Sequence, residues 1–426
     1  MDKSGLSDLA MRTVEPAVTW LMGMTLERPG LISLAAGFTD GDSLPVNETR
    51  ALLNDLLVPT SGGRKALQYG TTAGDPELRR LTAAHVEGLD GGRAGQERVY
   101  DPERMFITSG SQQLLYVLTE CLCNPGDIVL VEDPTYFVYL GITRSHGLEC
   151  RGVRLDADGI DLEALEGVLE RLRARGELKR VKLLYLVTYY QNPTGLSTAW
   201  TKKAEAIRIL RRYERAAGHP IYLVEDAAYR ELRFQGDDIP SALTVPGARD
   251  RVVYGGTYSK PFATGVRVGF GILPARLLQV VLRVKANHDF GTSNLLQQLM
   301  RVAMDSGVYQ RHLEVLRSRY AKKAKAMVRA MHEHFPKEVE WREPRGGLYV
   351  WARLPRRIRT GLKSPLFETA LRNEVLYVPG GLCYAEDLTR RRPDHEMRIS
   401  FGGEKVNNLR RGVERLGGSM RRVMGS

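Results

Sequence analysis

The sequence predicts an α/β protein with a large, mostly parallel sheet flanked by helices and a smaller α+β domain. Between residues 105 and 272, short apolar runs rich in β-branched residues alternate with helical patterns. Nearly continuous apolar runs are typical of strands buried on both faces, and their alternation with helices indicates a parallel sheet. After residue 307 the alternation ends, and a long helical pattern precedes short strand-like segments.

The strands expected in the large sheet are short and are separated by helices or turn residues. They cover residues 105–108, 128–131, 183–187, 221–224, 252–254 and 266–272. A helix is expected over residues 161–175, because leucine and valine recur on one face of that segment. Gly176 follows the pattern and is expected to end the helix.

The C-terminal part of the chain is expected to form the second domain. Apolar residues recur there at helical spacing, at Leu313, Leu316, Tyr320, Ala324, Met327 and Met331. This spacing predicts a long amphipathic helix. Short strands are expected at 346–351, 375–380 and 397–402, between turn residues. We therefore predict a large domain over residues 46–306 and a small domain built from residues 1–45 and 307–426.

Composition and length indicate an ordinary globular protein. The 426 residues suffice for two or three lobes. No apolar run approaches the roughly 18 residues that span a bilayer, and residues 1–5 show no signal-peptide pattern. We expect a cytoplasmic protein that does not enter a membrane. The four cysteines and eight histidines lack the spacing of disulfide frameworks or metal sites, so we expect reduced thiols and no metal.

The net charge of +12 raises the question of a nucleic-acid partner. The basic residues are spread along the chain and mixed with acids, with local clusters only at 390–392 and 410–411. No basic helix is interleaved with aromatic residues. This pattern favours a solvated basic surface over a nucleic-acid interface.

A set of chemically active residues surrounds Lys260. The lysine ends Thr257-Tyr258-Ser259-Lys260 and is preceded by the segments Asn192-Pro193-Thr194-Gly195 and Glu225-Asp226-Ala227-Ala228-Tyr229. Arg267 follows seven residues later. An amine, an acid, an amide, a phenol and a guanidinium together suit pyridoxal phosphate. The amine forms a Schiff base, the acid pairs with the ring nitrogen, and the hydroxyls and guanidinium hold the phosphate.

Three candidate positions, Ser111, Asp226 and Arg398, also have an ordinary structural interpretation. Ser111 follows a strand and opens a helix, where it could face a phosphate or simply cap the helix. Asp226 ends a strand, where ligands bind in open α/β sheets, or it could cap the next turn. Arg398 lies in an apolar segment, where it could pair with a buried carboxylate or face water from an edge strand.

The ordered set of motifs resembles the class I/II aminotransferases of fold type I, over roughly residues 30 to 403. Within them, the chain is most similar to the branch of aminoadipate and kynurenine aminotransferases. The motifs are 31–37, Gln68-Tyr69-Gly70, 74–79, Ser109-Gly110-Ser111-Gln112-Gln113, Asp133-Pro134-Thr135-Tyr136, Asn192-Pro193-Thr194-Gly195, Asp226-Ala227-Ala228-Tyr229, Ser259-Lys260, Arg267 and Arg398.

The resemblance implies a pyridoxal 5'-phosphate site with Lys260, Asp226 and Tyr229 as catalytic residues. Lys260 would bind the cofactor covalently and then shuttle a proton at the substrate Cα. Asp226 would pair with the ring nitrogen, Tyr229 and Asn192 would contact the ring hydroxyl oxygen, and Tyr136 would stack on the ring. The residues expected to hold the phosphate are Ser111, Gln112, Thr257, Ser259 and Arg267.

The resemblance also implies how substrate and a second subunit take part. Arg398 would bind the substrate α-carboxylate together with Asn192, and Gly37 would line the substrate pocket. Tyr69 would reach the phosphate of the neighbouring subunit, so a homodimer with shared active sites is expected. Residues 38–45 are longer and more acidic than the stretch that usually helps to choose the substrate side chain in this family.

The expected activity is ping-pong transfer of an amino group from an L-amino acid to a 2-oxo acid, with 2-oxoglutarate as the family's usual acceptor. Two alternatives remain at this point. The same site could support decarboxylation, elimination or oxidation, because these reactions share one electron sink. The other alternative is a transcription regulator that binds the cofactor, although only some 30 residues precede the match, too few for a winged-helix DNA-binding domain. The amino donor is left open.

Overall fold

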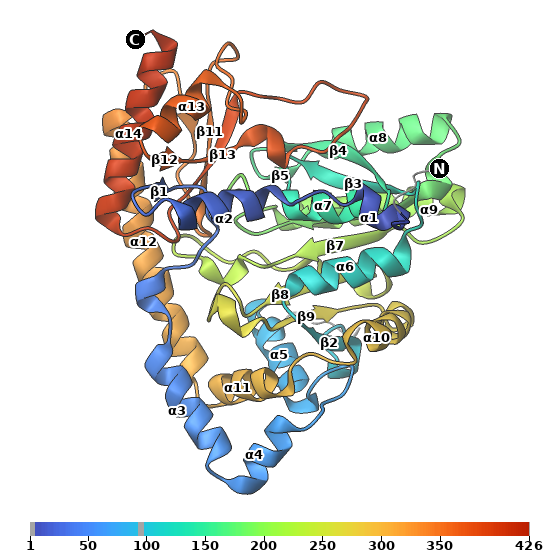
Figure 1. Ribbon diagram of the computed structural model, residues 1–426. Coiled ribbons are helices and arrows are strands. Elements are labelled where there is room, and N and C mark those ends of the chain that lie inside the picture. The colour runs from blue at the N-terminus through green and yellow to red at the C-terminus, as the bar shows by residue number, and fades with distance from the viewer. Residues whose placement is uncertain (1–4, 93–97, 426) are drawn as a thin grey trace.

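The computed structural model describes residues 5–92 and 98–425. Outside the described residues lie 1–4, 93–97 and 426, and the first of these ranges is the start of the chain, where no signal peptide is expected. An eight-stranded sheet forms the centre of the molecule, in the order β2-β9-β8-β7-β6-β3-β4-β5 (Figure 1). Its strands are β2 (Met105–Thr108), β3 (Ile128–Asp133), β4 (Glu149–Asp156), β5 (Gly159–Ile160), β6 (Val181–Val187), β7 (Tyr222–Asp226), β8 (Val252–Thr257) and β9 (Gly269–Ile272).

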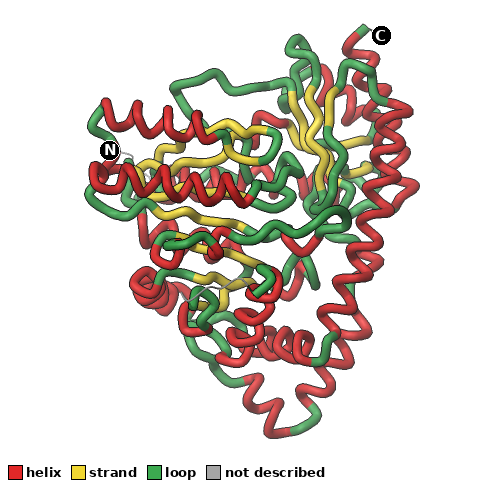
Figure 2. The backbone as a smooth tube through the Cα atoms, turned by 180° about the vertical axis from the view of Figure 1, so that it is seen from behind, coloured by secondary structure: helices red, strands yellow, loops and turns green. Residues whose placement is uncertain are grey.

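The centre of this sheet is parallel, which confirms the predicted fold class. Strands β8, β7, β6, β3 and β4 pair in parallel, whereas β2, β9 and β5 join antiparallel at the two sides. Figure 1 shows α6 (Ser111–Leu122) and α7 (Phe137–Ser145) on one face of the sheet. Figure 2 shows α8 (Leu162–Ala174) and α9 (Trp200–Ala217) on the other. Covering both faces explains why the strand sequences are almost continuously apolar.

Local sequence signals account for most element boundaries. Helix α8 begins where the Asp161 carboxylate accepts a hydrogen bond from the Ala164 N–H at 2.9 Å. It ends before Gly176, which has a φ of +70°. The prediction of one strand over 266–272 is wrong in its first half. Residues 264–266 form a 3₁₀ turn, Arg267 has a φ of 51°, and β9 begins only at Gly269.

Strand β4 had no counterpart among the expected strands. Its sequence, Glu149 to Asp156, contains two arginines and two acids, and only Cys150 and Val153 are buried. The strand lies near one side of the sheet, between β3 and the two-residue strand β5. Fewer apolar residues are needed there than in the central strands, so its sequence lacks the continuous apolar run that marks the others.

A second, antiparallel sheet lies in the C-terminal part of the chain. It comprises β10 (Glu340–Trp341), β11 (Tyr349–Arg353), β14 (Glu396–Ser400) and β13 (Val378–Pro379), in that order. The long predicted helix is α12 (Val308–His334), and its expected apolar face is buried. The remaining C-terminal helices are α13 (Pro365–Arg372) and α14 (Val406–Met424).

The N-terminal segment is joined to this second sheet region. Strand β1 (Ile32–Ser33) pairs in parallel with β12 (Val375–Leu376). The other helices of the chain are α1 (Asp8–Arg12), α2 (Ala17–Glu27), α3 (Val46–Leu57), α4 (Thr60–Leu67), α5 (Pro76–Leu89), α10 (Ala275–Asp289) and α11 (Asn294–Asp305). Figure 1 shows the blue N-terminal segment crossing the large sheet region towards the red C-terminal elements.

Asp40 anchors the acidic segment that follows Gly37. Its buried carboxylate pairs with Arg319 and with Lys323, whose Nζ lies 2.6 Å from Asp40 Oδ1. Burial raises the pKa of Asp40, but the hydrogen bonds and charges of Arg319 and Lys323 outweigh it and hold the pKa below its usual value. This acid therefore fastens residues 38–45 to α12.

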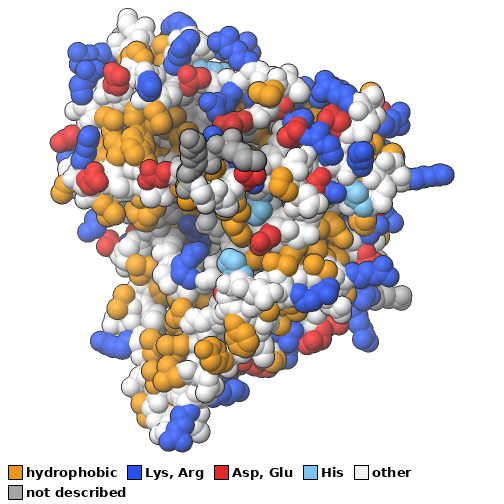
Figure 3. Space-filling view, turned by 45° about the vertical axis from the view of Figure 1, so that its right-hand side comes forward, with side chains coloured by type: hydrophobic (Ala, Val, Ile, Leu, Met, Phe, Trp, Pro, Cys, Tyr) orange, Lys and Arg blue, Asp and Glu red, His pale blue; other side chains and the backbone are white. Residues whose placement is uncertain are grey.

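The surface carries mixed charges. Figure 3 shows Lys and Arg side chains interspersed with acids over the visible face, with apolar patches between them. One apolar region lies at the lower end of the molecule, where α3 and α4 meet. Exposed side chains there include Leu57, Val58, Leu67 and Tyr69.

The cysteines lie apart as free thiols, and burial raises the pKa of Cys150 to about 11. Within residues 5–92 and 98–425, no helix combines the length and apolarity needed to cross a membrane. The same residues contain no cluster of three or more His, Cys, Asp or Glu side chains suited to a metal ion.

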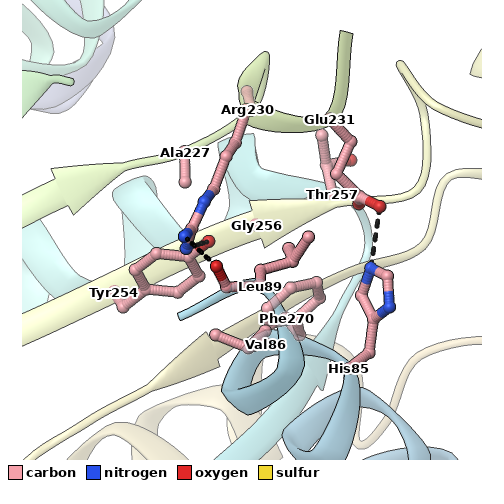
Figure 4. Close-up of a pocket in the computed structure, with 11 residues that line it drawn as sticks. His85, Val86, Leu89, Ala227, Arg230, Glu231, Tyr254, Gly256, Thr257 and Phe270 are labelled. Atoms are coloured by element: carbon pink, nitrogen blue, oxygen red, sulfur yellow. Dashed lines mark hydrogen bonds and ion pairs between the residues drawn. The ribbon is translucent and has the colours of Figure 1, made fainter. Parts of the chain in front are cut away.

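A small cavity lies between β8 and α5, next to a buried charge network (Figure 4). Its volume of about 10 Å³ leaves room for about one water molecule, so it is not a cofactor site. Arg230 reaches along it towards the Tyr254 hydroxyl and the Leu89 carbonyl. The Arg230 Nη2 lies 2.7 Å from Asp90 Oδ1, and both side chains are almost fully buried.

Removing one partner of this pair should strongly destabilise the fold. Asp90→Ala removes one of the two carboxylates that pair with the buried Arg230 guanidinium, the other being Asp238, and breaking a buried ion pair costs about 3–5 kcal/mol. We expect a clearly lower midpoint in thermal or urea unfolding. Glu333→Ala, which breaks the solvent-exposed Arg329–Glu333 pair, is the control and should leave the midpoint nearly unchanged. Equal effects of the two variants would contradict the structural role of the buried pair.

Candidate active site

Lys260 lies just after β8, among residues from both ends of the chain. Its Nζ donates a hydrogen bond to the Gly37 carbonyl oxygen at 3.0 Å. Burial lowers the pKa of Lys260, and the nearby Arg267 and Arg398 lower it further, although Tyr349 opposes the shift. A lysine with a lowered pKa is more often neutral, which is the form that attacks a carbonyl carbon.

Asp226 is the last residue of β7 and is buried beside the lysine's strand. The Tyr185 hydroxyl donates to its Oδ2 at 2.8 Å, and the Ala228 N–H donates to its Oδ1 at 3.1 Å. Burial nevertheless raises the pKa of Asp226 to about 6. One carboxylate oxygen does bind the following turn, as the structural alternative suggested. A cationic partner at the carboxylate would restore its charge, because opposite charges favour ionisation.

A candidate anion site lies at the N-terminus of α6. Gly110 is the N-cap residue, with a φ of 75° and no side-chain hydrogen bond to the first turn, so Ser111 opens the helix and does not cap it. A Cβ atom on Gly110 would lie only 2.7 Å from Arg267 Nη2. The Arg267 Nη1 donates to the Ser259 hydroxyl at 3.2 Å. A helix N-terminus, a guanidinium and a hydroxyl therefore converge, which suits a phosphate.

The remaining predicted phosphate residues flank this point. Thr257 accepts a hydrogen bond from the Ser259 N–H at 3.1 Å, so its hydroxyl also shapes the turn that leads to Lys260. Gln112 is exposed in the first turn of α6. Gln112 is close to Gly110 in the sequence, whereas Thr257 ends β8 and is brought near by the fold.

Arg398 is buried in β14, between β11 and β13, with 3% of its surface exposed. The alternative of an edge-strand arginine facing water is therefore wrong. Its Nη1 donates to Asn192 Oδ1 at 2.7 Å and its Nη2 to the Ala35 carbonyl at 2.6 Å. Its buried Nε has no hydrogen-bond partner among the described residues. The guanidinium thus retains a positive charge held by neutral acceptors, which suits an incoming carboxylate.

Tyr349 of β11 is a site residue that the sequence analysis did not single out. Its hydroxyl lies 3.1 Å from the Tyr229 hydroxyl, and its ring centre lies 4.2 Å from the Arg398 Cζ. Tyr229 is buried, with 6% of its surface exposed. A tyrosine in an apolar strand matches the ordinary pattern of a core residue, which is why no local signal marked Tyr349.

Tyr136 and Tyr69 lie in contrasting environments. Tyr136 precedes α7, and burial raises the pKa of its phenol. The charges of Asp226 and Arg398 also act on this phenol, so Tyr136 lies close to both groups. Tyr69 is 82% exposed, and its ring meets the edge of Phe290 at 5.4 Å between centroids. Within the described part of the chain, Tyr69 makes no hydrogen bond or ring contact with the other predicted site residues.

Known proteins are similar to this chain in sequence and in fold. The sequence profile described as aminotransferase class I and II matches residues 29–416. The 2-aminoadipate transaminase of Thermus thermophilus is 33% identical over 403 residues, which cover 93% of this chain and 92% of that protein. Aromatic-amino-acid aminotransferase 1 of Thermococcus litoralis is 30% identical over 399 residues, covering 94% and 90%. A crystal structure of Pyrococcus horikoshii kynurenine aminotransferase, in complex with PMP, aligns with a TM-score of 0.88 at 28% identity, covering 99% and 98%.

Pyridoxal phosphate is the cofactor of this family. The residues present fit it: a lysine with a lowered pKa, a buried acid, and an uncapped helix N-terminus beside an arginine. At Gly110 itself, Arg267 and the N-terminus of α6 are both positive, which favours a phosphate there. The chain therefore belongs to the aminotransferase class I and II family and is a pyridoxal-phosphate-dependent aminotransferase of fold type I.

Proposed function

We propose that this enzyme transfers the amino group of an L-amino acid to 2-oxoglutarate in two half-reactions of a ping-pong mechanism. The observation that supports this most is that Lys260 follows β8, which pairs with the strand that ends at Asp226, and that the Arg398 charge acts on the lysine. Asp226 lies on the cofactor side, and Arg398, with its unpartnered Nε, lies on the substrate side. Such a site can bind both an amino acid and a 2-oxo acid, because both have the same carboxylate next to the reacting carbon.

We assign the cofactor contacts according to the geometry of the chain. Asp226 pairs with the ring nitrogen, Tyr229 and Asn192 contact the ring hydroxyl oxygen, and Tyr136 covers the ring face. The phosphate is held by Ser111, Gln112, Thr257, Ser259 and Arg267. The convergence of Arg267, Ser259 and the α6 N-terminus supports the phosphate assignment.

Lys260 is the acid and base of the proposed reaction. Bound pyridoxal phosphate supplies the electron sink that stabilises negative charge at the substrate Cα. The Lys260 Nζ would take the proton from the substrate Cα and shuttle it to the cofactor carbon bound to the substrate nitrogen. The lowered pKa of Lys260 supports this role, because a base is most effective when it is neutral at the working pH.

Arg398 and Asn192 orient the substrate. The two are already joined by a 2.7 Å hydrogen bond, so the guanidinium plane is fixed before the α-carboxylate arrives. Gly37 lines the same space, since its carbonyl meets Lys260 and a Cβ there would lie 2.9 Å from the Tyr349 hydroxyl.

We further propose a homodimer with shared sites, in the cytoplasm, with the domain division at residues 46–306. The exposed Tyr69 and the apolar side chains around α3 and α4 support a subunit interface. The free thiols are consistent with a reducing compartment. The pairing of β1 with β12 supports a small domain that contains both ends of the chain.

The function is tested first by absorption spectroscopy. The purified enzyme should show a visible cofactor band that bleaches on adding an L-amino acid, with one equivalent of 2-oxo acid released. A panel of aromatic, branched-chain and acidic L-amino acids identifies the donor. Carbon dioxide, ammonia or hydrogen peroxide in place of a matched 2-oxo acid and new amino acid would refute transamination.

Removing the Lys260 amine should abolish turnover. Lys260→Ala loses the group that moves the Cα proton, and removal of such a group typically costs 10²- to 10⁴-fold or more in rate. The measurement is steady-state formation of glutamate from 2-oxoglutarate. Lys322→Ala, at an exposed lysine on α12 to which no role is assigned, is the control. Multiple turnovers at the wild-type rate in the Lys260 variant would overturn the assignment.

Truncating Arg398 should chiefly weaken substrate binding. Arg398→Ala removes a charge-assisted contact to the α-carboxylate, and losing such a bond costs about 1.5–3 kcal/mol, or roughly 10- to 150-fold in kcat/KM. Arg398→Lys keeps the positive charge but not the two-nitrogen geometry. Its kcat/KM should therefore lie between that of the wild type and that of Arg398→Ala. Unchanged saturation by the amino acid and by 2-oxoglutarate would contradict the proposed contact.

Hybrid dimers test whether Tyr69 acts across the subunit interface. Tyr69→Ala and Lys260→Ala should each be nearly inactive alone. If Tyr69 serves the partner's site, co-expression restores about a quarter of the activity, because random pairing makes about half of the dimers hybrid with one intact site each. If Tyr69 serves its own chain, mixing restores nothing, and the shared-site proposal fails.

A further inference from the structure

Tyr349 connects three groups to which the proposed function gives separate roles. Its ring lies against the Arg398 guanidinium, its hydroxyl lies 3.1 Å from the Tyr229 hydroxyl, and the same hydroxyl limits the space at Gly37. Only 2% of Tyr349 is exposed, and it belongs to β11, which pairs directly with the Arg398 strand β14. The residue is thus held firmly at the point where cofactor side and substrate side meet.

We propose that Tyr349 is a positioning residue that sets the substrate clamp through its ring and the cofactor-contacting Tyr229 through its hydroxyl. This inference rests on the proposed function and deepens it. The two parts of the side chain have different effects, so they can be separated by substitution. The ring governs carboxylate binding, and the hydroxyl governs the chemistry at the cofactor side.

The ring acts on Arg398 because the guanidinium is buried with neutral partners. The Arg398 Cζ lies 4.2 Å from the Tyr349 ring centre and 5.4 Å from that of Phe137, so aromatic faces approach it from two residues. A cation beside aromatic rings in a water-poor site is stabilised electrostatically. The rings also restrict rotation of the guanidinium, which leaves fewer orientations to lose when a carboxylate binds.

The hydroxyl acts on Tyr229 through the direction of one hydrogen bond. Each phenol has a single proton. If the Tyr229 proton is donated to the ring oxygen of the cofactor, as we propose above, the Tyr349 hydroxyl has to be the donor between the two phenols. A phenol that accepts one hydrogen bond becomes a better donor of its own, because hydrogen bonds in a chain polarise one another. Tyr349 therefore strengthens the Tyr229 contact without touching the cofactor itself.

The position of the hydroxyl also explains a requirement for glycine at residue 37. A Cβ there would lie 2.9 Å from the Tyr349 hydroxyl oxygen, closer than a normal contact. Gly37 has no positive φ among the described backbone angles, so the hydroxyl, and not the backbone conformation, is what an alanine would meet. Removing the hydroxyl should make room for this methyl group.

Two substitutions at one position separate the effects. Tyr349→Phe removes only the hydroxyl, and Tyr349→Leu removes the ring as well. Tyr377→Phe is the matched control: Tyr377 is fully buried and donates to the Thr360 carbonyl at 2.9 Å, away from the site residues. Folding of each variant is checked by thermal unfolding. Kinetics with 2-oxoglutarate are combined with calorimetric binding of 2-oxoglutarate in the Lys260→Ala background, where no turnover interferes.

We expect Tyr349→Phe to lower kcat about threefold to tenfold, the effect of one hydrogen bond, while the 2-oxoglutarate dissociation constant changes less than about twofold. Its visible cofactor band should also shift in wavelength, because the ring oxygen loses hydrogen-bond strength. Tyr349→Leu should in addition weaken 2-oxoglutarate binding on the order of tenfold. Tyr377→Phe should match the wild type in kcat, binding and spectrum.

The reciprocal test uses Gly37. Gly37→Ala should strongly reduce activity in the wild-type background and less so in Tyr349→Phe, because the clash is relieved. Equal losses in both backgrounds, or a Tyr349→Leu variant that binds 2-oxoglutarate normally, would overturn the inference. If the wild type transaminates no amino acid, the proposed function fails instead, and calorimetric binding in the Lys260→Ala background still decides the role of the ring.

Discussion

The arrangement of the site depends on one buried cation, Arg398. Its hydrogen bonds join residues that are 206 and 363 positions away in sequence, Asn192 and Ala35. A buried guanidinium is unfavourable unless hydrogen-bond acceptors or aromatic faces compensate its charge. The loop after β6, the N-terminal segment and β11 therefore have to meet at β14, and their meeting point is the space in which the substrate is proposed to bind.

The same scarcity of water sets the charges of the reactive groups. Burial lowers the pKa of Lys260 and raises that of Asp226, so each group is pushed towards its neutral form for the same physical reason. A neutral amine is a nucleophile, and a buried carboxylate is stabilised in its charged form by a cation, which is the role proposed for a protonated ring nitrogen. Tyr349 extends this logic, because its phenol lies between Arg398, the cation proposed to bind carboxylates, and Tyr229, the phenol proposed to contact the cofactor.

Much of the fold was predictable because its signals are local. The apolar runs at β2, β3, β6, β7 and β8 and the helical pattern of α12 follow from periodicity and burial. Strand β4 was missed because a sheet flank tolerates charged residues, and the start of β9 was misplaced because a turn around Arg267 precedes it. Such features depend on neighbours in space, which periodicity does not describe.

The sequence by itself determined the kinds of chemistry available: an amine, an acid, an amide and an arginine at family-like spacing, on strands and helices that their own residues favour. Only the tertiary structure decided which of them act together. Arg398 is buried, and Asp40 forms ion pairs with Arg319 and Lys323. Tyr349, which matches the sequence pattern of an ordinary core tyrosine, lies against Arg398. The physical reason is that burial and pairing arise from contacts between distant segments, whereas propensity and spacing are properties of adjacent residues.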